Sequence, residues 1–453
     1  MAKLFGSSGV RDVVNMDLTP ILATQIGMAI GTHSKAKRAV VARDTRTSGL
    51  MLENALASGL MSCGVNVSCM GILPTPVLAF LTKKINADVG VMITASHNPP
   101  QYNGIKVFNP DSMAYGEESQ DQVEETLKHE RYTLADWRNI GEIQHLDATH
   151  LYTQKIKQSV KLCGKWHVVV DAGCGATYSL APRVLGALGC KVTALNAQPD
   201  GFFPARSPEP NEESLKSLAK TVKNLEADVG FAYDGDGDRV TFIDEKGKLA
   251  NFDRVLAAYA SYVTKKNGGG IIVTNVEASM CIEKMVERHG AKVLRTKVGD
   301  VYLSKVMKKE NAIFGGEPCG AWIHPQFHHC PDGILSSVLL LKALEDENRN
   351  LTEMIAETPE YQTLRKNIAF SNDEKYKVVK KIGENSPRIF PKRKGLSKVD
   401  GIRISLEDGW ILIRASGTEP LVRLTVEGES LKTAKNIMEK GIMLVEQFAG
   451  KVK

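Results

Sequence analysis

A serine and a histidine stand where a buried strand is expected to end. Residues 89–94 (Val-Gly-Val-Met-Ile-Thr) are apolar or β-branched, and Ala-Ser96-His97-Asn-Pro-Pro follows. The two prolines prevent a helix from starting there, so an exposed loop is predicted. Ligands of α/β sheets bind at the carboxyl ends of strands. Ser96 is therefore a candidate nucleophile, although this segment alone fits an ordinary turn equally well.

Three aspartates, Asp234, Asp236 and Asp238, alternate with glycine after a second apolar strand. Residues i, i+2 and i+4 of an extended backbone share a face, so the carboxylates can converge. Like charges this close raise one another's pKa, and a divalent cation such as Mg²⁺ removes that cost. An EF-hand is disfavoured because Arg239 stands where its loop needs glycine and residues 240–243 are predicted to be a strand. A magnesium site is predicted, with solvated turn carboxylates as the alternative.

Two further loops combine glycine with polar groups. Residues 315–320 (Gly-Gly-Glu317-Pro-Cys319-Gly) offer a carboxylate and a thiol, although a tight turn is the simpler interpretation. Residues 414–420 (Arg-Ala-Ser-Gly-Thr-Glu-Pro), followed by Arg423, supply guanidinium groups, hydroxyls and a glycine backbone. Such donors bind a phosphate dianion through charge-assisted hydrogen bonds. A plain turn between two strands is the alternative.

Other basic residues stand near expected strand ends without forming a specific motif. Arg11, the arginines of residues 42–49, and Lys106 just past the Ser96 loop belong to this group. Surface arginines are usually solvated, so these positions predict no site by themselves.

The composition is that of a globular protein, with 43% hydrophobic and 24% charged residues over a length of 453. The net charge of +6 is mild for this length and suits phosphorylated metabolites better than nucleic acid. The 8 cysteines show no zinc spacing, which is typical of reduced thiols, so a cytoplasmic protein is expected. No stretch approaches about 18 apolar residues and the start lacks a signal-peptide core, so no membrane partner is expected.

One strand–helix–strand pattern occurs three times. Ala-Asp-Val-Gly at 87–90 recurs at 227–230, a looser copy starts at 312, and each opens an apolar strand that ends in a polar loop. Upstream of each copy, a predicted helix ends at a glycine, the usual residue at that position. These glycines are Gly64, Gly189 and Gly290. Three tandem similar α/β domains are therefore predicted.

The C-terminal part follows another pattern. A polar helix over 372–385 precedes two alternating apolar runs joined by Asp408-Gly409, which is a hairpin signal. A strand over 421–427 and a helix over 430–445 complete a smaller α+β domain. The predicted domains are residues 1–150, 151–250, 251–367 and 368–453.

Together, four motifs resemble the α-D-phosphohexomutase superfamily: Thr94–Pro99, Asp234–Arg239, Gly316–Gly320 and Arg414–Pro420. Their order and spacing match over essentially the whole chain. The resemblance implies a four-domain, heart-shaped enzyme that moves a phosphoryl group between the 6- and 1-positions of a hexose phosphate. It also implies a phosphoserine, a hexose 1,6-bisphosphate intermediate, one Mg²⁺ per chain and a small-molecule hexose phosphate as partner. A monomer or homodimer is expected.

The resemblance also assigns roles to individual residues. Ser96 is the phosphoserine, and the Mg²⁺ ligands are this residue, Asp234, Asp236 and Asp238. Contact with the phosphoserine or acid–base catalysis falls to Arg11, His97, Lys106 and Arg239, with Lys106 as general acid or base. Glu317 and Cys319 contact sugar hydroxyls. The non-reacting phosphate is held by Arg414, Ser416, Gly417, Thr418 and Arg423.

The loop of residues 315–320, called the sugar loop below, departs from the family pattern. Many relatives carry Ser-Gly-His after the glutamate, whereas this chain has Cys-Gly-Ala321. Another histidine could replace the missing one, or these could be surface loop residues; the candidates are His324, His328 and His329. The loss of a positive charge beside Glu317 favours an amino sugar.

Two other segments bear on the substrate. Leu4-Phe5-Gly6 and Lys297-Val-Gly-Asp300 resemble phosphoglucosamine mutases, whereas Thr94 resembles phosphomannomutase/phosphoglucomutase. The expected reaction converts glucosamine 6-phosphate to glucosamine 1-phosphate, with phosphomannomutase/phosphoglucomutase activity as the alternative. A metal-dependent sugar phosphatase and a non-catalytic sugar-phosphate sensor are the alternatives of a different class.

Overall fold

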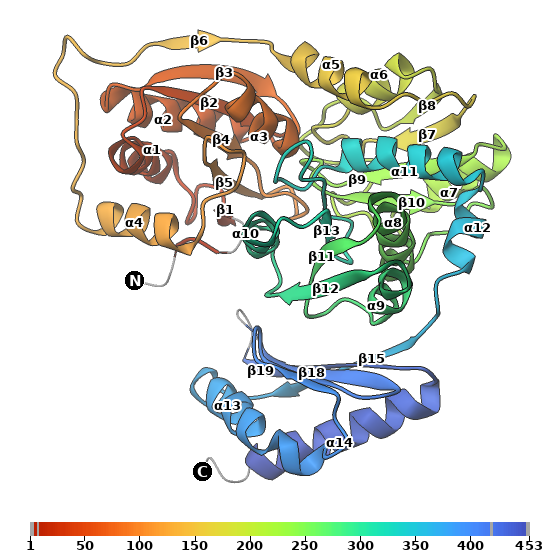
Figure 1. Cartoon of the computed structure of the whole chain (residues 1–453). Helices are drawn as coiled ribbons and strands as arrows, with labels where there is room; N and C mark the ends of the chain where they lie inside the picture. Colours follow the sequence, from red (N-terminus) through yellow and green to blue (C-terminus); the bar gives the residue numbers. More distant parts are fainter. Residues whose placement is uncertain (1–3, 7–8, 417–419, 450–453) are drawn as a thin grey trace. The chain divides into compact units, whose positions relative to one another are not determined.

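The computed structural model describes residues 4–6, 9–416 and 420–449. Within them the chain forms two compact units: Met1–Phe252 with Gly299–Ile355, and Asp253–Val298 with Ala356–Lys453. Figure 1 shows the elements of both units. In the described part of the chain, no helix is long and apolar enough to cross a membrane.

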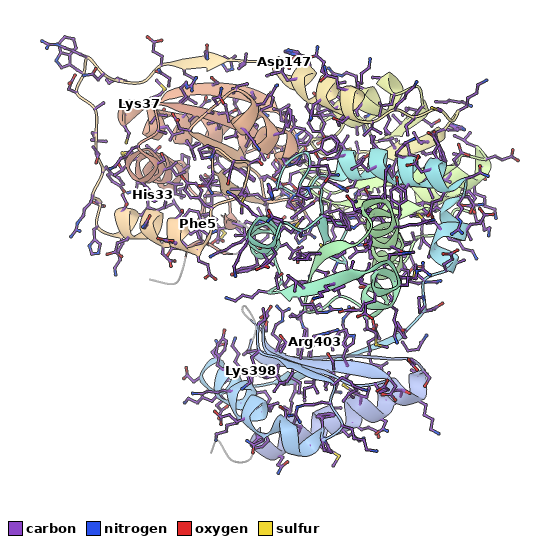
Figure 2. The ribbon with its side chains drawn as sticks, viewed as in Figure 1. Phe5, His33, Lys37, Asp147, Lys398 and Arg403 are labelled. Atoms are coloured by element: carbon purple, nitrogen blue, oxygen red, sulfur yellow. The ribbon has the colours of Figure 1, made fainter. Side chains whose placement is uncertain are left out.

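The N-terminal part of the first unit is built on a mixed sheet of order β1-β5-β4-β2-β3-β6. Its strands are β1 Val10–Val13, β2 Arg38–Arg43, β3 Asn66–Ile72, β4 Val89–Ile93, β5 Tyr102–Phe108 and β6 Ile143–His145. Its helices are α1 Pro20–Ser34, α2 Gly49–Ser62, α3 Thr75–Lys84 and α4 Glu117–Lys128. The amide of Phe5, a residue labelled in Figure 2, donates to Glu124 on α4 and ties the start of the described chain to this helix. The expected buried strand is confirmed as β4, whose residues are all buried.

A second sheet of the first unit has the order β10-β9-β7-β8. Its strands are β7 His167–Asp171, β8 Lys191–Leu195, β9 Val229–Tyr233 and β10 Val240–Ile243, and α5 Thr149–Ser159, α6 Leu180–Ala187 and α7 Lys216–Asn224 accompany them. The strand over 240–243 is confirmed as β10, so the aspartate loop lies in a hairpin and is no EF-hand.

The third repeat contributes elements to both units. The first unit contains α10 Asp300–Glu310, β13 Phe314–Gly316, β14 Trp322–Ile323 and α11 Gly333–Glu347, and α12 Leu351–Ala356 follows. The second unit contains β11 Gly270–Asn275, α9 Cys281–Val286, a 3₁₀ turn Glu287–His289 and β12 Ala291–Thr296, after α8 Phe252–Asn267. The parallel pair β11 and β12 matches the predicted strand–helix–strand pattern.

The repeated pattern is confirmed, and its polar loops share one topological position. Each loop joins a functional strand to an antiparallel return strand: β4 to β5, β9 to β10, and β13 to β14. The helix-ending glycines at 64, 189 and 290 have φ of 78°, 91° and 78°, the left-handed values that favour glycine.

The C-terminal part of the second unit is an antiparallel sheet of order β15-β19-β18-β17-β16. Its strands are β15 Gln362–Ala369, β16 Gly395–Ser397, β17 Ile402–Ser405, β18 Gly409–Ala415 and β19 Leu421–Gly428. Helices α13 Asn372–Ile389 and α14 Leu431–Ala449 cover one face around a core that includes Ile411, Leu424 and Val445 (Figure 1). The hairpin at Asp408-Gly409 and the α/β plus α+β class are confirmed, whereas the exact domain boundaries stay predictions.

Candidate active site

Ser96 itself is buried, although Pro99 in the same loop is exposed, so the expected exposed position of this serine is a wrong prediction. Ser96 has φ of 51° and no solvent exposure. Its hydroxyl donates to Asp234 Oδ2 at 2.7 Å, and its amide donates to Thr94 Oγ1 at 2.9 Å. The aspartate loop covers it closely, because a Cβ on Gly235 would lie 2.4 Å from the Ser96 carbonyl oxygen. A left-handed conformation is strained for serine, and it directs the hydroxyl at a carboxylate.

A buried arginine holds this loop, and sequence reasoning missed it by treating it as a surface residue. Arg46 has 1% exposure and donates to the carbonyls of Ser96, Asn98, Pro99 and Tyr102 at 2.6–2.9 Å. Its Nε pairs with buried Asp44 at 3.0 Å, which also accepts from Thr94 at 2.7 Å. Asp44 and Thr94 follow neighbouring parallel strands, β2 and β4, and this adjacency was the available signal.

The three aspartates converge as predicted. One ligand oxygen from each of Asp234, Asp236 and Asp238 lies within 4.8 Å of the others, and all three residues are buried. Burial, together with the charges of Asp238 and Asp236, raises the pKa of Asp234 well above its usual value. Burial alone would also raise the pKa of Asp236, but the ammonium of Lys106 outweighs it and lowers that pKa.

These residues fit a metal ion. Asp236 Oδ1 and Asp238 Oδ1 are buried and have no hydrogen-bond partner among the described residues. Each of these carboxylates satisfies its other oxygen: Asp236 Oδ2 accepts from Thr75 and Lys106, and Asp238 Oδ2 accepts from Lys106. A buried acceptor without a partner is costly. A divalent cation would supply a partner for both oxygens, because hard cations bind carboxylate oxygens.

Four of the predicted catalytic residues surround this cluster. Lys106 Nζ bonds Asp236 and Asp238 at 2.7 Å each; burial alone would lower its pKa, but the two carboxylates outweigh burial and raise it. Lys106 is therefore a protonated ammonium that donates hydrogen bonds to both carboxylates. Burial and the charges of Arg239 and Arg11 lower the pKa of His97 to about 4, so the ring beside Ser96 is neutral. Arg11 donates to Asn98 Oδ1 at 3.2 Å, and its buried Nε has no partner within the described residues.

The sugar loop joins the same cluster. Glu317 accepts from the Gly299 amide at 2.9 Å, and the Gly320 carbonyl accepts from the amide of Val240 at 3.1 Å, directly after the aspartate loop. Burial raises the pKa of Cys319 to about 12, against the opposing effect of Arg239, so the thiol stays protonated. The first unit therefore brings together Ser96, the aspartates, Glu317, Cys319 and the surrounding basic residues.

The histidines after the sugar loop have other partners. His324 is buried and its Nε2 lies 3.0 Å from Ser336 Oγ. His328 Nε2 lies 2.9 Å from Asp332, which accepts from Tyr152 and caps α11. The amide of His329 donates to Ser112 Oγ at 3.3 Å. The interpretation of all three as surface residues is wrong for His324 and His328, which are buried structural groups.

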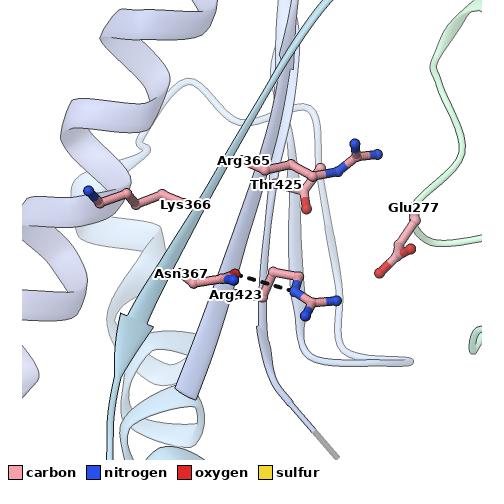
Figure 3. A pocket seen from close by; sticks show the side chains of 6 residues that line it. All are labelled: Glu277, Arg365, Lys366, Asn367, Arg423 and Thr425. Atoms are coloured by element: carbon pink, nitrogen blue, oxygen red, sulfur yellow. Dashed lines mark hydrogen bonds between the residues drawn. The ribbon is translucent and has the colours of Figure 1, made fainter. Parts of the chain in front are cut away.

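The predicted phosphate loop belongs to the second unit. Arg414 forms ion pairs with Glu277 at 2.5 Å and Asp400 at 3.2 Å, so two carboxylates face it. Arg423 donates to Asn367 at 3.3 Å and lines a cavity of about 400 Å³ (Figure 3). The Ser416 amide bonds the Leu421 carbonyl at 3.0 Å. Gly417 and Thr418 lie outside the described residues.

Comparison with known proteins identifies the family to which the chain belongs. Profiles for phosphoglucomutase/phosphomannomutase α/β/α domains I, II and III and for the C-terminal domain match residues 2–133, 148–247, 251–361 and 366–441. The chain belongs to the phosphoglucomutase/phosphomannomutase family. The superfamily resemblance seen in the motifs is thereby confirmed, and the protein is a phosphohexomutase, an intramolecular phosphotransferase.

Individual relatives of this phosphohexomutase match over its full length. A probable phosphoglucosamine mutase of Pyrococcus abyssi is 43% identical over 98% of each chain. The phosphoglucosamine mutase of Methanocaldococcus jannaschii is 43% identical over 99% of each chain. A solved phosphoglucomutase/phosphomannomutase family protein from Burkholderia thailandensis has a TM-score of 0.89 at 28% identity, covering 99% of this chain and 98% of its own.

Proposed function

We propose that this phosphohexomutase interconverts glucosamine 6-phosphate and glucosamine 1-phosphate through a phosphoserine at Ser96. The observation that carries the proposal is the hydroxyl of Ser96, held in a left-handed conformation 2.7 Å from one carboxylate of a converging aspartate cluster. The amino sugar is supported by the full-length relatives named phosphoglucosamine mutase.

The proposed metal is one Mg²⁺ per chain. Its ligands would be Asp234, Asp236, Asp238 and the phosphate on Ser96, and when bound it would spread the negative charge of the transferring phosphoryl oxygens. All donors in this set are oxygens, which suits a hard cation.

The reaction consists of two phosphoryl transfers. In the first, the bond from phosphorus to Ser96 Oγ breaks and a bond to O1 of glucosamine 6-phosphate forms, while the sugar hydroxyl proton passes to the serine oxygen. Lys106 is the group that relays this proton: its ammonium, which hydrogen-bonds Asp236 and Asp238, protonates the departing Ser96 oxygen, and the amine then takes up the proton of the sugar hydroxyl. The resulting glucosamine 1,6-bisphosphate turns end for end. In the second transfer, the bond from phosphorus to O6 breaks, a bond to Ser96 Oγ forms, and the serine hydroxyl proton passes to O6, leaving glucosamine 1-phosphate.

The remaining residues bind and orient the substrate. Arg11 and Arg239 are proposed to contact the phosphate on Ser96, with neutral His97 as a hydrogen-bond partner. Glu317 and Cys319 would contact sugar hydroxyls. The non-reacting phosphate would be held by Arg414, Ser416, Gly417, Thr418 and Arg423.

The sugar loop supports the amino sugar on electrostatic grounds. Ala321 stands where the family pattern has a histidine, so position 321 carries no imidazolium that could repel a 2-ammonium group. A carboxylate attracts that ammonium, and a site built for a polar group rejects analogues that leave it unpaired. Glucose phosphate is expected to react more slowly, and mannose phosphate, with its axial 2-hydroxyl, slowest.

A side-by-side assay tests the proposal. The kcat/KM is measured for the 1- or 6-phosphates of glucosamine, glucose and mannose, and inorganic phosphate is measured in each reaction. The highest value for glucosamine phosphate, without net phosphate release, is expected. A higher value for the mannose or glucose phosphate would favour the phosphomannomutase/phosphoglucomutase alternative, and stoichiometric phosphate release would indicate a phosphatase. The cytoplasmic location and the monomeric or dimeric state stay predictions.

A further inference from the structure

A polar cavity opens on the face of the C-terminal sheet that the helices leave uncovered. It has a volume of about 400 Å³ and is lined by Glu277, Arg365, Lys366, Asn367, Arg423 and Thr425. Figure 3 shows the guanidinium groups of Arg365 and Arg423 on the sheet side, with the Glu277 carboxylate across from them. Arg365 belongs to none of the sequence motifs that predicted a phosphate site.

The strand register explains why these arginines meet. Arg365 on β15 is paired with Thr425 on β19, and Asn367 is paired with Arg423. Directly opposed residues and their i+2 neighbours share one face of a sheet, so Arg365 and Arg423 lie diagonally on the same face. Lys366 is paired with Leu424, which belongs to the core under the helices, and its ammonium points away from the cavity in Figure 3.

The charges favour an anion in this cavity. Arg365 donates no hydrogen bond and forms no close ion pair within the part of the chain that the structure describes, although its charge acts on the buried Asp253 carboxyl. Glu277, the acidic residue among those lining the cavity, forms its ion pair with Arg414 at 2.5 Å. Two guanidinium forks with the Asn367 amide and the Thr425 hydroxyl beside them match the geometry of phosphate oxygens.

We propose that Arg365 is a further substrate-binding residue, which together with Arg423 binds the non-reacting phosphate of the hexose phosphate in this cavity. The inference rests on the proposed function for the identity of the substrate. The Glu277 carboxylate competes with that phosphate for the guanidinium groups. Removal of Arg365 therefore weakens phosphate binding, and removal of the Glu277 charge strengthens it.

Matched variants of the full chain test this inference. Arg365→Gln should raise KM for glucosamine 6-phosphate, and the Kd of inorganic phosphate measured by calorimetry, by about 3- to 10-fold, with kcat within about twofold of the wild type. Lys366→Gln removes the same charge from the next residue on the opposite face, and both constants should stay within about twofold. Glu277→Gln should lower the Kd of inorganic phosphate.

The outcomes separate this inference from the proposed function. Equal effects of Arg365→Gln and Lys366→Gln, or no effect of either in an active mutase, would overturn the role of Arg365 and leave the function intact. If the variants showed the expected differences in the Kd of inorganic phosphate but the wild type had no mutase activity, the anion site would stand and the proposed function would be refuted. A double variant of Arg365 and Arg423 should weaken binding by less than the product of the single effects if both hold the same phosphate, and a full product would contradict a shared site.

Discussion

Replacement of Arg46 by lysine should destabilise the protein and slow phosphoryl transfer together. Among the described residues, the Arg46 guanidinium donates five hydrogen bonds: one to Asp44 and one to each of four loop carbonyls. A lysine ammonium donates at most three, from a single point, so at least two bonds are lost. Each bond to a charged donor contributes about 1.5–3 kcal/mol, so Arg46→Lys should lower the free energy of unfolding by about 3 kcal/mol or more.

The matched control is Arg43→Lys, three residues earlier. Arg43 bonds Glu53 at 2.9 Å and is partly exposed, so the change should stay below about 1 kcal/mol. Urea unfolding measures both variants. The kcat for glucosamine 6-phosphate should fall by about 100-fold in Arg46→Lys, because the loop that orients Ser96 loosens, with KM little changed. Equal unfolding energies and equal kcat for the two variants would refute the argument that Arg46 holds the catalytic loop.

Three further predictions follow from the sites described above. Asp236→Asn should lower kcat by at least about 100-fold, since an amide is a poorer ligand for a hard cation, and chelation should inhibit the wild type reversibly on Mg²⁺ addition; unchanged activity after exhaustive chelation would count against the metal. Arg414→Ala should raise KM for glucosamine 6-phosphate by about 10- to 100-fold with a smaller effect on kcat, and an unchanged KM would exclude Arg414 from phosphate binding. Burial lowers the pKa of His324 to about 3 from an unfolded value of 6.5. As the pH falls from 6.5 toward 3, the unfolded state binds a proton that the folded state does not, so the free energy of unfolding decreases. When the pH is lowered from 7 to 4.5, the free energy of unfolding measured in urea should therefore decrease by about 2–3 kcal/mol less in His324→Gln than in the wild type. Equal decreases in the two proteins would disprove the neutral buried ring.

The parts that could be predicted from the sequence are those fixed by local pattern. The apolar runs gave β4, β9 and β10 within a residue or two, and Gly64 marked a helix end because a left-handed backbone favours glycine. The alternating aspartates were also expected to converge, and one ligand oxygen from each does lie within 4.8 Å of the others.

The parts that failed depend on the contacts between loops. Arg46 looks like a surface arginine in the sequence, and only the adjacency of β2 and β4 buries it under the Ser96 loop. Ser96 was expected to be exposed, but Gly235 lets the aspartate loop cover it. His324 and His328 stand in a stretch without clear helix or strand periodicity. Their partners are Ser336 of α11 and the N-cap residue Asp332, whose positions no local pattern reveals.

The measurement that tests the central claim most directly is the phosphorylation state of Ser96 during turnover. Intact-mass analysis and peptide mapping of the active enzyme should find one phosphoryl group on Ser96, and substoichiometric glucosamine 6-phosphate should discharge it into the bisphosphate. The Ser96→Ala variant should stay folded, carry no phosphoryl group there and lose activity by several orders of magnitude. A fully active enzyme without a phosphorylated Ser96, or near-normal activity in Ser96→Ala, would contradict the account.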